Sequence, residues 1–200
     1  MKVFLTGLLF LLAAVASAPG QAKYRLIGEE LVKMEKADQE ARMKCTALNG
    51  DEKIRCFAEI GPSIDVPNVK RLGEIYGQIG FPNTAKVGKA AFQAFLTILQ
   101  HAPTDDLRVK SLKPIEAAFK KSELSAINYA NFVDRLRIHL GKKQLYGSQF
   151  DFKDGKLVMS PAADLKNLAK RRVRIGLPPL SEYIKELREL YHMEVEIPKH

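Results

Sequence analysis

The sequence predicts a mainly α-helical protein with one short β-hairpin at about residues 144–159. Apolar residues recur at three- and four-residue steps through most of the chain, which is the spacing of one helix face. Asp154-Gly155 separates two short strand-like runs, and this dipeptide favours a tight type I′ turn. With 200 residues, of which 46% are hydrophobic, the chain can bury one good core.

The first 22 residues are predicted to be a secretory signal peptide. Lys2 supplies a positive charge, and the apolar run that follows, residues 3–16, is too short to span a bilayer but suits a signal sequence. Cleavage is expected after Ala18 or Ala22, and an uncleaved signal anchor is the alternative. No later stretch is apolar enough for a transmembrane segment, so we expect a secreted or periplasmic protein.

Residues 23–64 are expected to form an N-terminal helix, Lys23 to Leu48, and a disulfide loop. Cys45 and Cys56 are the only cysteines, and Asn49-Gly50-Asp51 between them is typical of a turn. In an oxidising compartment this pair is expected to form one disulfide. A structural zinc site would need four ligands, and no histidine is near in sequence, so we predict no metal there.

Residues 65–200 are expected to form a helical domain that carries the hairpin. Asp65 is predicted to cap its first helix, Pro114 to kink or split another, and Gly141 to end a third in the left-handed conformation. Ser160-Pro161 is predicted to open a helix that runs to Lys170. The helices are expected at about residues 66–79, 87–102, 105–121, 125–140, 160–170 and 181–193.

The formal net charge of +9 favours anionic partners such as acidic envelope polymers or lipid headgroups. Most of the basic residues interleave with acids, as on a solvated helix face, and this pattern does not favour nucleic acid. Only Leu168 to Arg174 is densely basic. A basic interaction protein that works through Lys170 to Arg174 is therefore one hypothesis, and salt-sensitive binding would be its sign.

Four short runs together resemble an uncharacterised, mostly bacterial family, a domain of unknown function. They are QHA at 100–102, DR at 134–135, QLYGSQ at 144–149 and GLPPLSEY at 176–183. The resemblance covers about Asp65 to Tyr183. Phe81 and Ser148 stand where the family pattern has tryptophan and threonine, and Pro103 stands where an acid often follows. The resemblance implies a site at these motifs and no particular reaction.

The same motifs supply the candidate site residues. His101, at the edge of an apolar helix stripe, and Asp134, beside another, are expected to meet so that the carboxylate orients the imidazole as a general base. Arg135 is expected to point to the polar side, and Arg137 is a candidate partner for Asp134. The catalytic candidates are His101, Asp134 and Gln149, and the ligand-binding candidates are Arg135, Gln144, Tyr146, Ser148 and Arg172.

Each candidate also has a structural interpretation, as a hydrogen-bonded core histidine, a buried ion pair or a polar edge strand. The sequence holds no Gly-x-Ser-x-Gly stretch, no His-Glu-x-x-His motif and no phosphate loop, and it identifies no cofactor. It predicts a small polar pocket, either of a hydrolase or transferase or of a non-catalytic module that binds carbohydrate, peptide or an anionic envelope polymer. Whether the protein is an enzyme stays open at this point.

Overall fold

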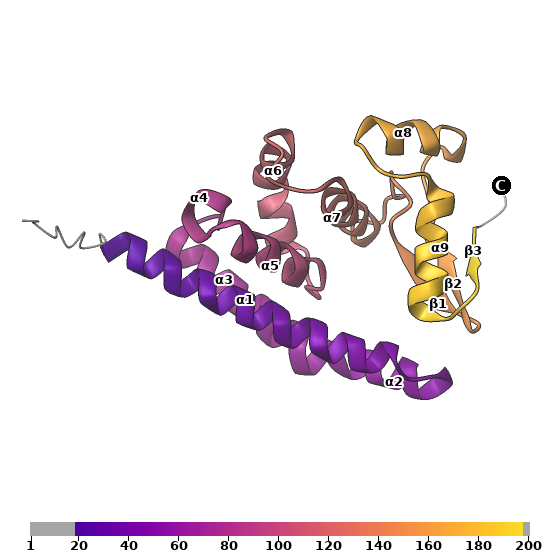
Figure 1. Cartoon of the computed structure of the whole chain (residues 1–200), viewed down its shortest axis with the longest axis horizontal. Helices are drawn as coiled ribbons and strands as arrows, with labels where there is room; N and C mark the ends of the chain where they lie inside the picture. The colour runs from indigo at the N-terminus through magenta and orange to yellow at the C-terminus, as the bar shows by residue number, and fades with distance from the viewer. Residues whose placement is uncertain (1–18, 198–200) are drawn as a thin grey trace, which may run out of the picture.

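A computed structural model describes residues 19–197, in which helices dominate and a small sheet lies near the C-terminus (Figure 1). The predicted signal peptide falls mostly outside these residues. The elements are, in order, α1 (Pro19–Thr46), α2 (Gly50–Ile60), η1 (Gly61–Asp65), α3 (Val66–Ile79), α4 (Thr84–Val87), α5 (Lys89–Gln100), α6 (Asp106–Lys120), α7 (Ala126–His139), β1 (Phe150–Lys153), β2 (Lys156–Met159), η2 (Leu165–Asn167), α8 (Leu168–Arg174), α9 (Leu180–Tyr191) and β3 (Val195–Glu196).

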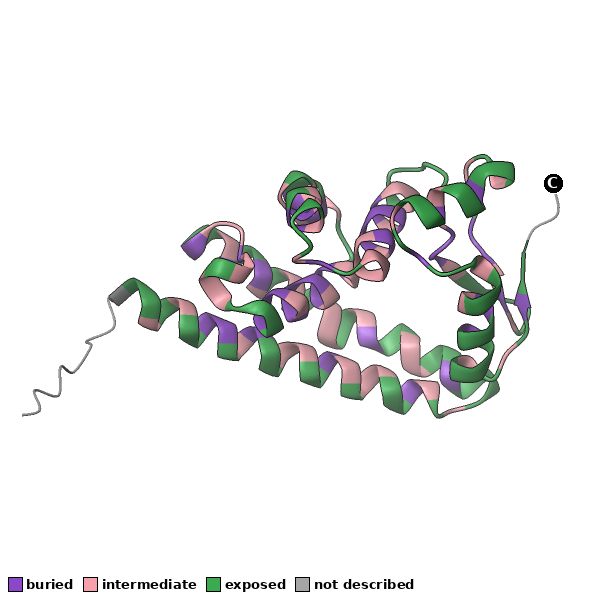
Figure 2. Cartoon of the chain, turned by 45° about the horizontal axis from the view of Figure 1, so that its top comes forward, coloured by how far each residue is buried: buried purple, intermediate pink, exposed green. Residues whose placement is uncertain are grey.

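The main core forms where α1, α3, α5, α6 and α7 meet. Buried positions on α1 alternate with exposed ones, as an amphipathic helix requires (Figure 2). Gly28 lets α1 approach the end of α4 closely, because a Cβ there would lie 2.8 Å from the carbonyl oxygen of Val87. The fully buried apolar side chains of this core include Leu31, Leu72, Ile75, Phe92, Phe95, Leu99, Ile115 and Phe132.

The chain reverses direction after α1, and a disulfide joins the end of α1 to α2. Cys45 and Cys56 are bonded, which confirms the predicted bridge. The segment between them was predicted to be a loop, and this is wrong after the turn, because α2 begins at Gly50. A π-helical turn, η1, joins α2 to α3, and Asp65 lies in this turn instead of capping a helix.

The predicted hairpin is confirmed as β1 and β2, which pair antiparallel with Phe150 opposite Met159. Asp154 and Gly155 have φ angles of 49° and 74°, the positive values that a type I′ turn requires. The strand β3 adds to β2 in parallel, and α9 packs on this sheet through a second apolar cluster. Residues 144–149 are not a strand; they form a loop between α7 and β1.

Two other predictions about helices are wrong. The segment that begins at Ser160-Pro161 is irregular up to η2, and Ser160 donates a hydrogen bond to Asp151 (2.7 Å) instead of capping a helix. Pro114 does not split its helix, since α6 continues through it. The C-terminal end of α7 is as predicted, because Gly141 follows the helix at a φ of 69°. At the N-terminus the Ser125 hydroxyl accepts a hydrogen bond from the Asn128 N–H.

Within residues 19–197, none of the helices is both long and apolar enough to cross a bilayer.

Candidate functional site

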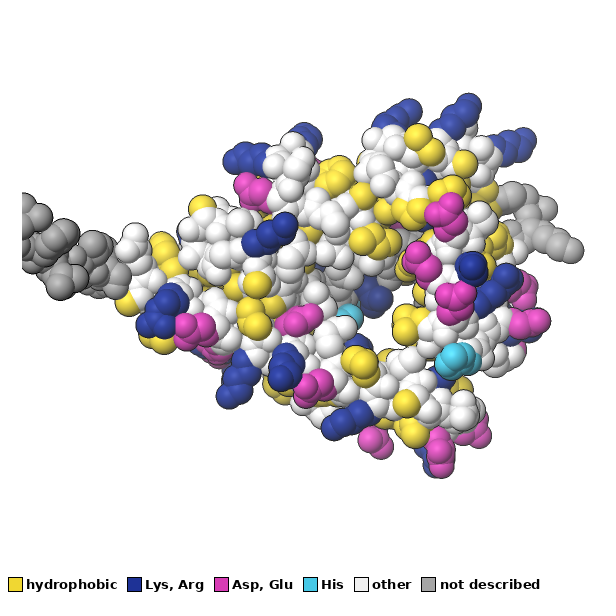
Figure 3. Space-filling model, viewed as in Figure 1, with side chains coloured by type: hydrophobic (Ala, Val, Ile, Leu, Met, Phe, Trp, Pro, Cys, Tyr) yellow, Lys and Arg dark blue, Asp and Glu magenta, His cyan; other side chains and the backbone are white. Residues whose placement is uncertain are grey.

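A cavity of about 440 Å³ separates α1 and the end of α5 from α7, α9 and the hairpin. The space-filling view shows the molecule hollowed between these two sides (Figure 3). This volume lies within the range of small-molecule sites. The polar side chains that line it are Gln39, Arg42, Thr46, Gln100, His101, Asn131, Arg135, Ser148, Gln149, Tyr183 and Tyr191.

His101 lines the cavity at the C-terminus of α5, and its carboxylate partner is Asp38 of α1. The distance from His101 Nδ1 to Asp38 Oδ2 is 3.0 Å, and the Asp38 side chain is fully buried. The predicted pairing of His101 with Asp134 is therefore wrong in its acid. The predicted arrangement, a carboxylate that orients one ring nitrogen of His101, is present with a residue 63 positions earlier in the chain.

Arg42, one helical turn after Asp38, holds two carboxylates. Its guanidinium donates to Asp38 at 3.1–3.2 Å and also to Asp65 of η1. Burial alone would raise the pKa of Asp38, but the hydrogen bonds and charges of His101 and Arg42 lower it to about 2. Burial and the nearby charge of Asp38 raise the pKa of Asp65 to about 6, although Arg42 opposes this.

The surroundings of the His101 ring favour its neutral form. Burial lowers its pKa, and the charges of Arg42 and Arg135 add to this effect, whereas Asp38 opposes it. Ionised Asp38 can only accept a hydrogen bond, so the proton of the neutral ring lies on Nδ1. Nε2 is then left with a free lone pair, which is the state that a general base needs.

Asp38, Asp65 and His101 also offer ligand atoms that lie within 4.8 Å of one another, so they could hold a metal ion. Arg42 donates hydrogen bonds to both carboxylates and supplies the positive charge that they need. A divalent cation would have to displace this guanidinium. The donor set therefore fits a hydrogen-bonded Arg–Asp–His cluster better than a metal centre.

Asp134 has a different position from the one expected. Its carboxylate is fully buried and accepts hydrogen bonds from the backbone N–H groups of Leu145 (2.6 Å), Tyr146 (3.0 Å) and Ser148 (3.1 Å), and from the Ser148 hydroxyl (2.9 Å). Burial raises its pKa, and these hydrogen bonds oppose the rise. Arg137 donates to the Lys143 carbonyl instead of to this acid. Asp134 therefore fixes the 144–149 loop.

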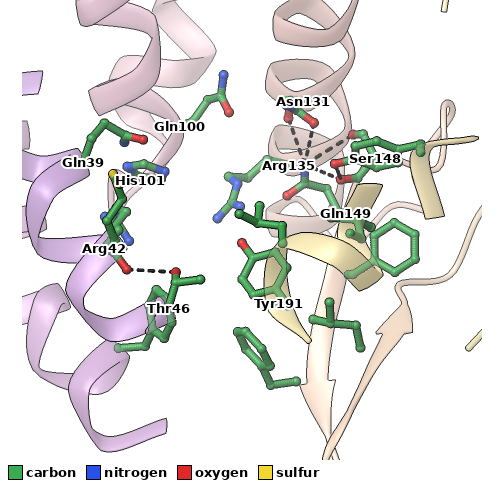
Figure 4. Close-up of a pocket in the computed structure, with 18 residues that line it drawn as sticks. Gln39, Arg42, Thr46, Gln100, His101, Asn131, Arg135, Ser148, Gln149 and Tyr191 are labelled. Carbon is green, nitrogen blue, oxygen red and sulfur yellow. Dashed lines mark hydrogen bonds between the residues drawn. The ribbon is translucent and has the colours of Figure 1, made fainter. Parts of the chain in front are cut away.

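Arg135 was expected on the polar side of its helix, and it lies on the same stripe of α7 as Asn131, one turn earlier. It extends from α7 into the cavity, toward the side of Arg42 and His101 (Figure 4). Its Nε is buried without a hydrogen-bond partner among the described residues. Burial, together with the charges of Arg108 and Arg42, lowers its pKa.

The other predicted residues divide into two groups. Gln149 and Ser148 line the cavity, and the Gln149 amide lies 3.4 Å from the Asn131 carbonyl oxygen. Gln144 is buried and donates to the carbonyls of Gln149 (3.0 Å) and Ser160 (2.6 Å), so it shapes the loop that carries these two. Tyr146 and Arg172 do not line the cavity.

The basic segment at 168–174 is less available than its composition indicates. Arg172 is buried, and its Nη1 donates to the Tyr146 carbonyl (2.7 Å). Arg171 donates to the Leu145 carbonyl at 2.8 Å. Two of its arginines therefore brace the 144–149 loop from behind, which leaves Lys170 and Arg174 exposed to solvent.

Sequence reasoning missed Asp38 and Arg42. Asp38 and Arg42 are four residues apart, so they lie on one face of α1. This spacing was a usable signal, but the same helix carries many other acid–base pairs at the surface, such as Arg25 with Glu29. Only the packing of α5 against α1 distinguishes the buried pair from the exposed ones.

The chain belongs to a family of unknown function, DUF6624, whose model matches residues 26–196. The predicted membership in an uncharacterised family is thereby confirmed. Neither the curated proteins nor the solved structures include a match to the chain.

Proposed function

We propose that the protein is a hydrolase in which His101, oriented by Asp38, activates a water molecule in the cavity. The hydrogen bond between the His101 ring and a fully buried carboxylate, at the wall of a 440 Å³ cavity, carries this proposal. The lowered pKa of His101 keeps the ring neutral at physiological pH, ready to accept a proton.

Water is the nucleophile because the aliphatic hydroxyls in the cavity are committed elsewhere. Thr46 donates to the Arg42 carbonyl (2.9 Å), and Ser148 donates to Asp134 (2.9 Å). Neither is hydrogen-bonded to His101, which a serine- or threonine-type nucleophile would require. Both cysteines are in the disulfide.

In the proposed step His101 Nε2 takes a proton from water as the water oxygen forms a bond to the electrophilic centre of the substrate. The bond to the leaving group then breaks, and the imidazolium returns the proton to that group. The amides of Gln39, Gln100 and Gln149 line the same space and are suited to orient polar groups of the substrate.

The test is a screen of chromogenic esters, anilides, glycosides and phosphate monoesters, each with and without EDTA. His101→Gln should lower the hydrolysis rate of an accepted substrate at least 100-fold, because a general base contributes about 10²–10⁴. His139→Gln is the matched control, since His139 lies beside Asp105 and does not line the cavity. Equal rates for wild type and His101→Gln would refute the proposal, and so would hydrolysis of none of the four classes.

A non-catalytic binding module is the second candidate, and the aromatic wall favours it. The rings of Phe57 and Phe152 lie 5.8 Å apart, and those of Phe152 and Tyr191 lie 5.7 Å apart. Such a row suits the face of a sugar or the side chain of a peptide. Ligand binding without turnover, equal in wild type and His101→Gln, would favour this function.

We also propose that the protein is exported. The N-terminal apolar run motivates this proposal, and the disulfide supports it because such bonds persist in oxidising compartments. N-terminal sequencing of the protein from an expressing bacterium should give Pro19 or Lys23 as the first residue. Retention of Met1 in the mature protein would contradict a cleaved signal peptide.

A further inference from the structure

Arg135 is a half-buried cation that its surroundings do not neutralise. Among the described residues no carboxylate forms an ion pair with it, and its Nε lacks any hydrogen-bond partner. Arginine keeps its proton under all ordinary conditions. A buried donor without a partner is costly, so the unpaired Nε of an arginine at a cavity wall favours a partner from outside the chain.

The nearby carboxylates already accept hydrogen bonds from other side chains. Asp38 and Asp65 both accept hydrogen bonds from Arg42. Asp151 accepts one from Ser160 at 2.7 Å. Within the described part of the chain, the side chains that line the cavity include two arginines and no acid, and Arg42 is already paired with two carboxylates. Arg135 is therefore the cation left to attract an anion.

Another part of the cavity wall is apolar. Met43, Leu190 and Phe152 line it with 71%, 58% and 42% of their surfaces exposed, which is unusual for large apolar residues. Phe57, Leu157 and Leu187 continue this lining. An apolar part of a ligand would cover these side chains and remove their surface from water.

We propose that the cavity binds an amphipathic acid: a carboxylate or phosphate held by the Arg135 guanidinium, on an aromatic or aliphatic body that packs against Phe57, Phe152 and Leu190. This inference rests on the proposed function for the role of the cavity and names the class of its substrate. The planar guanidinium can donate two parallel hydrogen bonds to either oxyanion.

Calorimetric titration with three probes tests the anion requirement: 3-phenylpropionate, phenyl phosphate and the neutral 3-phenylpropanol. At least one anionic probe should bind at least tenfold more tightly than the alcohol, and the tighter of the two identifies the preferred oxyanion. Arg135→Gln should weaken that probe at least tenfold and leave the alcohol unchanged. Arg174→Gln removes an exposed charge of the same kind and should change neither affinity.

Two further variants keep the result decisive. If Arg135→Gln does not fold, Arg135→Lys serves instead, because lysine keeps the positive charge but cannot donate the two parallel hydrogen bonds. Its affinity for the anionic probe should still be at least threefold weaker than that of the wild type. Phe152→Ala should weaken 3-phenylpropionate at least threefold. Equal binding of acid and alcohol by the wild type, no binding of either acid, or full affinity in a folded Arg135 variant would overturn the inference.

The proposed hydrolysis and the proposed ligand class fail separately. His101→Gln should still bind the anionic probe at least tenfold more tightly than the alcohol, because the Arg135 guanidinium and not the imidazole holds the anion. Anion-selective binding without turnover of any substrate would therefore refute the hydrolase and keep the ligand class. Turnover of neutral substrates alone would refute the ligand class and keep the hydrolase.

Discussion

Substitution of Asp134 should be among the most damaging changes in the chain. Asp134→Ala removes the acceptor for three backbone N–H groups and one hydroxyl, all on the 144–149 loop. A buried donor without a partner costs about 1–3 kcal/mol. Because the loop can relax and admit water, we take the lower end for each donor and expect a loss of about 3–5 kcal/mol in the free energy of unfolding. A domain of this size has only about 5–15 kcal/mol in total.

Asp134→Asn should cost less, about 2 kcal/mol, because one acceptor oxygen stays and the penalty for a buried charge disappears. Urea unfolding followed by far-ultraviolet circular dichroism measures both values. Asp106→Ala, an exposed acid in the first turn of α6, is the control and should cost less than about 1 kcal/mol. A loss below about 1 kcal/mol for Asp134→Ala would show that the loop does not depend on this carboxylate.

Three further predictions concern stability. Reduction of Cys45–Cys56 should lower the free energy of unfolding by about 2–3 kcal/mol, and a thermal melt that dithiothreitol leaves unchanged would contradict this. The pKa of Asp65 is raised from 3.8 to about 6, so the folded state binds its proton more tightly; its ionisation costs up to about 3 kcal/mol above pH 6, and this cost should vanish toward pH 4. Asp65→Asn should remove that pH dependence, and an unchanged profile would refute it. Gly28→Ala should destabilise by about 1–3 kcal/mol through the contact with the carbonyl of residue 87. At Gly73 of α3 an added Cβ would meet no atom of the described residues within 4 Å, so Gly73→Ala should instead stabilise by about 0.5–1 kcal/mol. Equal melting temperatures for the two variants would contradict the close approach of α1 to the end of α4.

Local signals predicted the elements well where the chain itself supplies the physical cause. The stripe of α5, the end of α7 at Gly141 and the Asp-Gly turn all act over a few residues, and the structure confirms them. The prediction of a loop between the two cysteines failed because a turn signal does not say whether a loop or a helix follows the turn. Asn49-Gly50 does form a turn after α1, but the next residues form a helix because the disulfide and η1 let α2 pack back along α1.

The sequence predicted which types of residue form the site, but it predicted their hydrogen-bond partners only in part. A buried carboxylate at position 134 does need partners, but the partners are backbone N–H groups of a loop that no periodicity can place. His101 does need an acid, and α1 supplies it from a face that looks solvated in sequence. Side-chain pairs across 63 residues depend on the packing of helices, which sequence spacing does not contain.

The charges that surround His101 give the two proposals one shared consequence. The groups that act on the ring are Asp38, which raises its pKa, and Arg42 and Arg135, which lower it together with burial. An anion bound at Arg135 would cancel part of that repulsion, so the pKa of His101 should rise in the complex. Because His101 acts as a base, the rate should fall as pH drops through this pKa.

The profile of kcat reports the complex, and that of kcat/KM reports the free enzyme. We therefore expect the acid limb of kcat to lie at higher pH than the acid limb of kcat/KM for an anionic substrate. In Arg135→Gln the repulsion between Arg135 and a protonated His101 is already absent. The acid limbs of kcat and kcat/KM should therefore lie at the same pH in this variant. Steady-state rates between pH 4 and 8 measure both profiles. Coincident limbs in the wild type, with full sensitivity to His101→Gln, would mean that the anion binds too far from the imidazole to act on it.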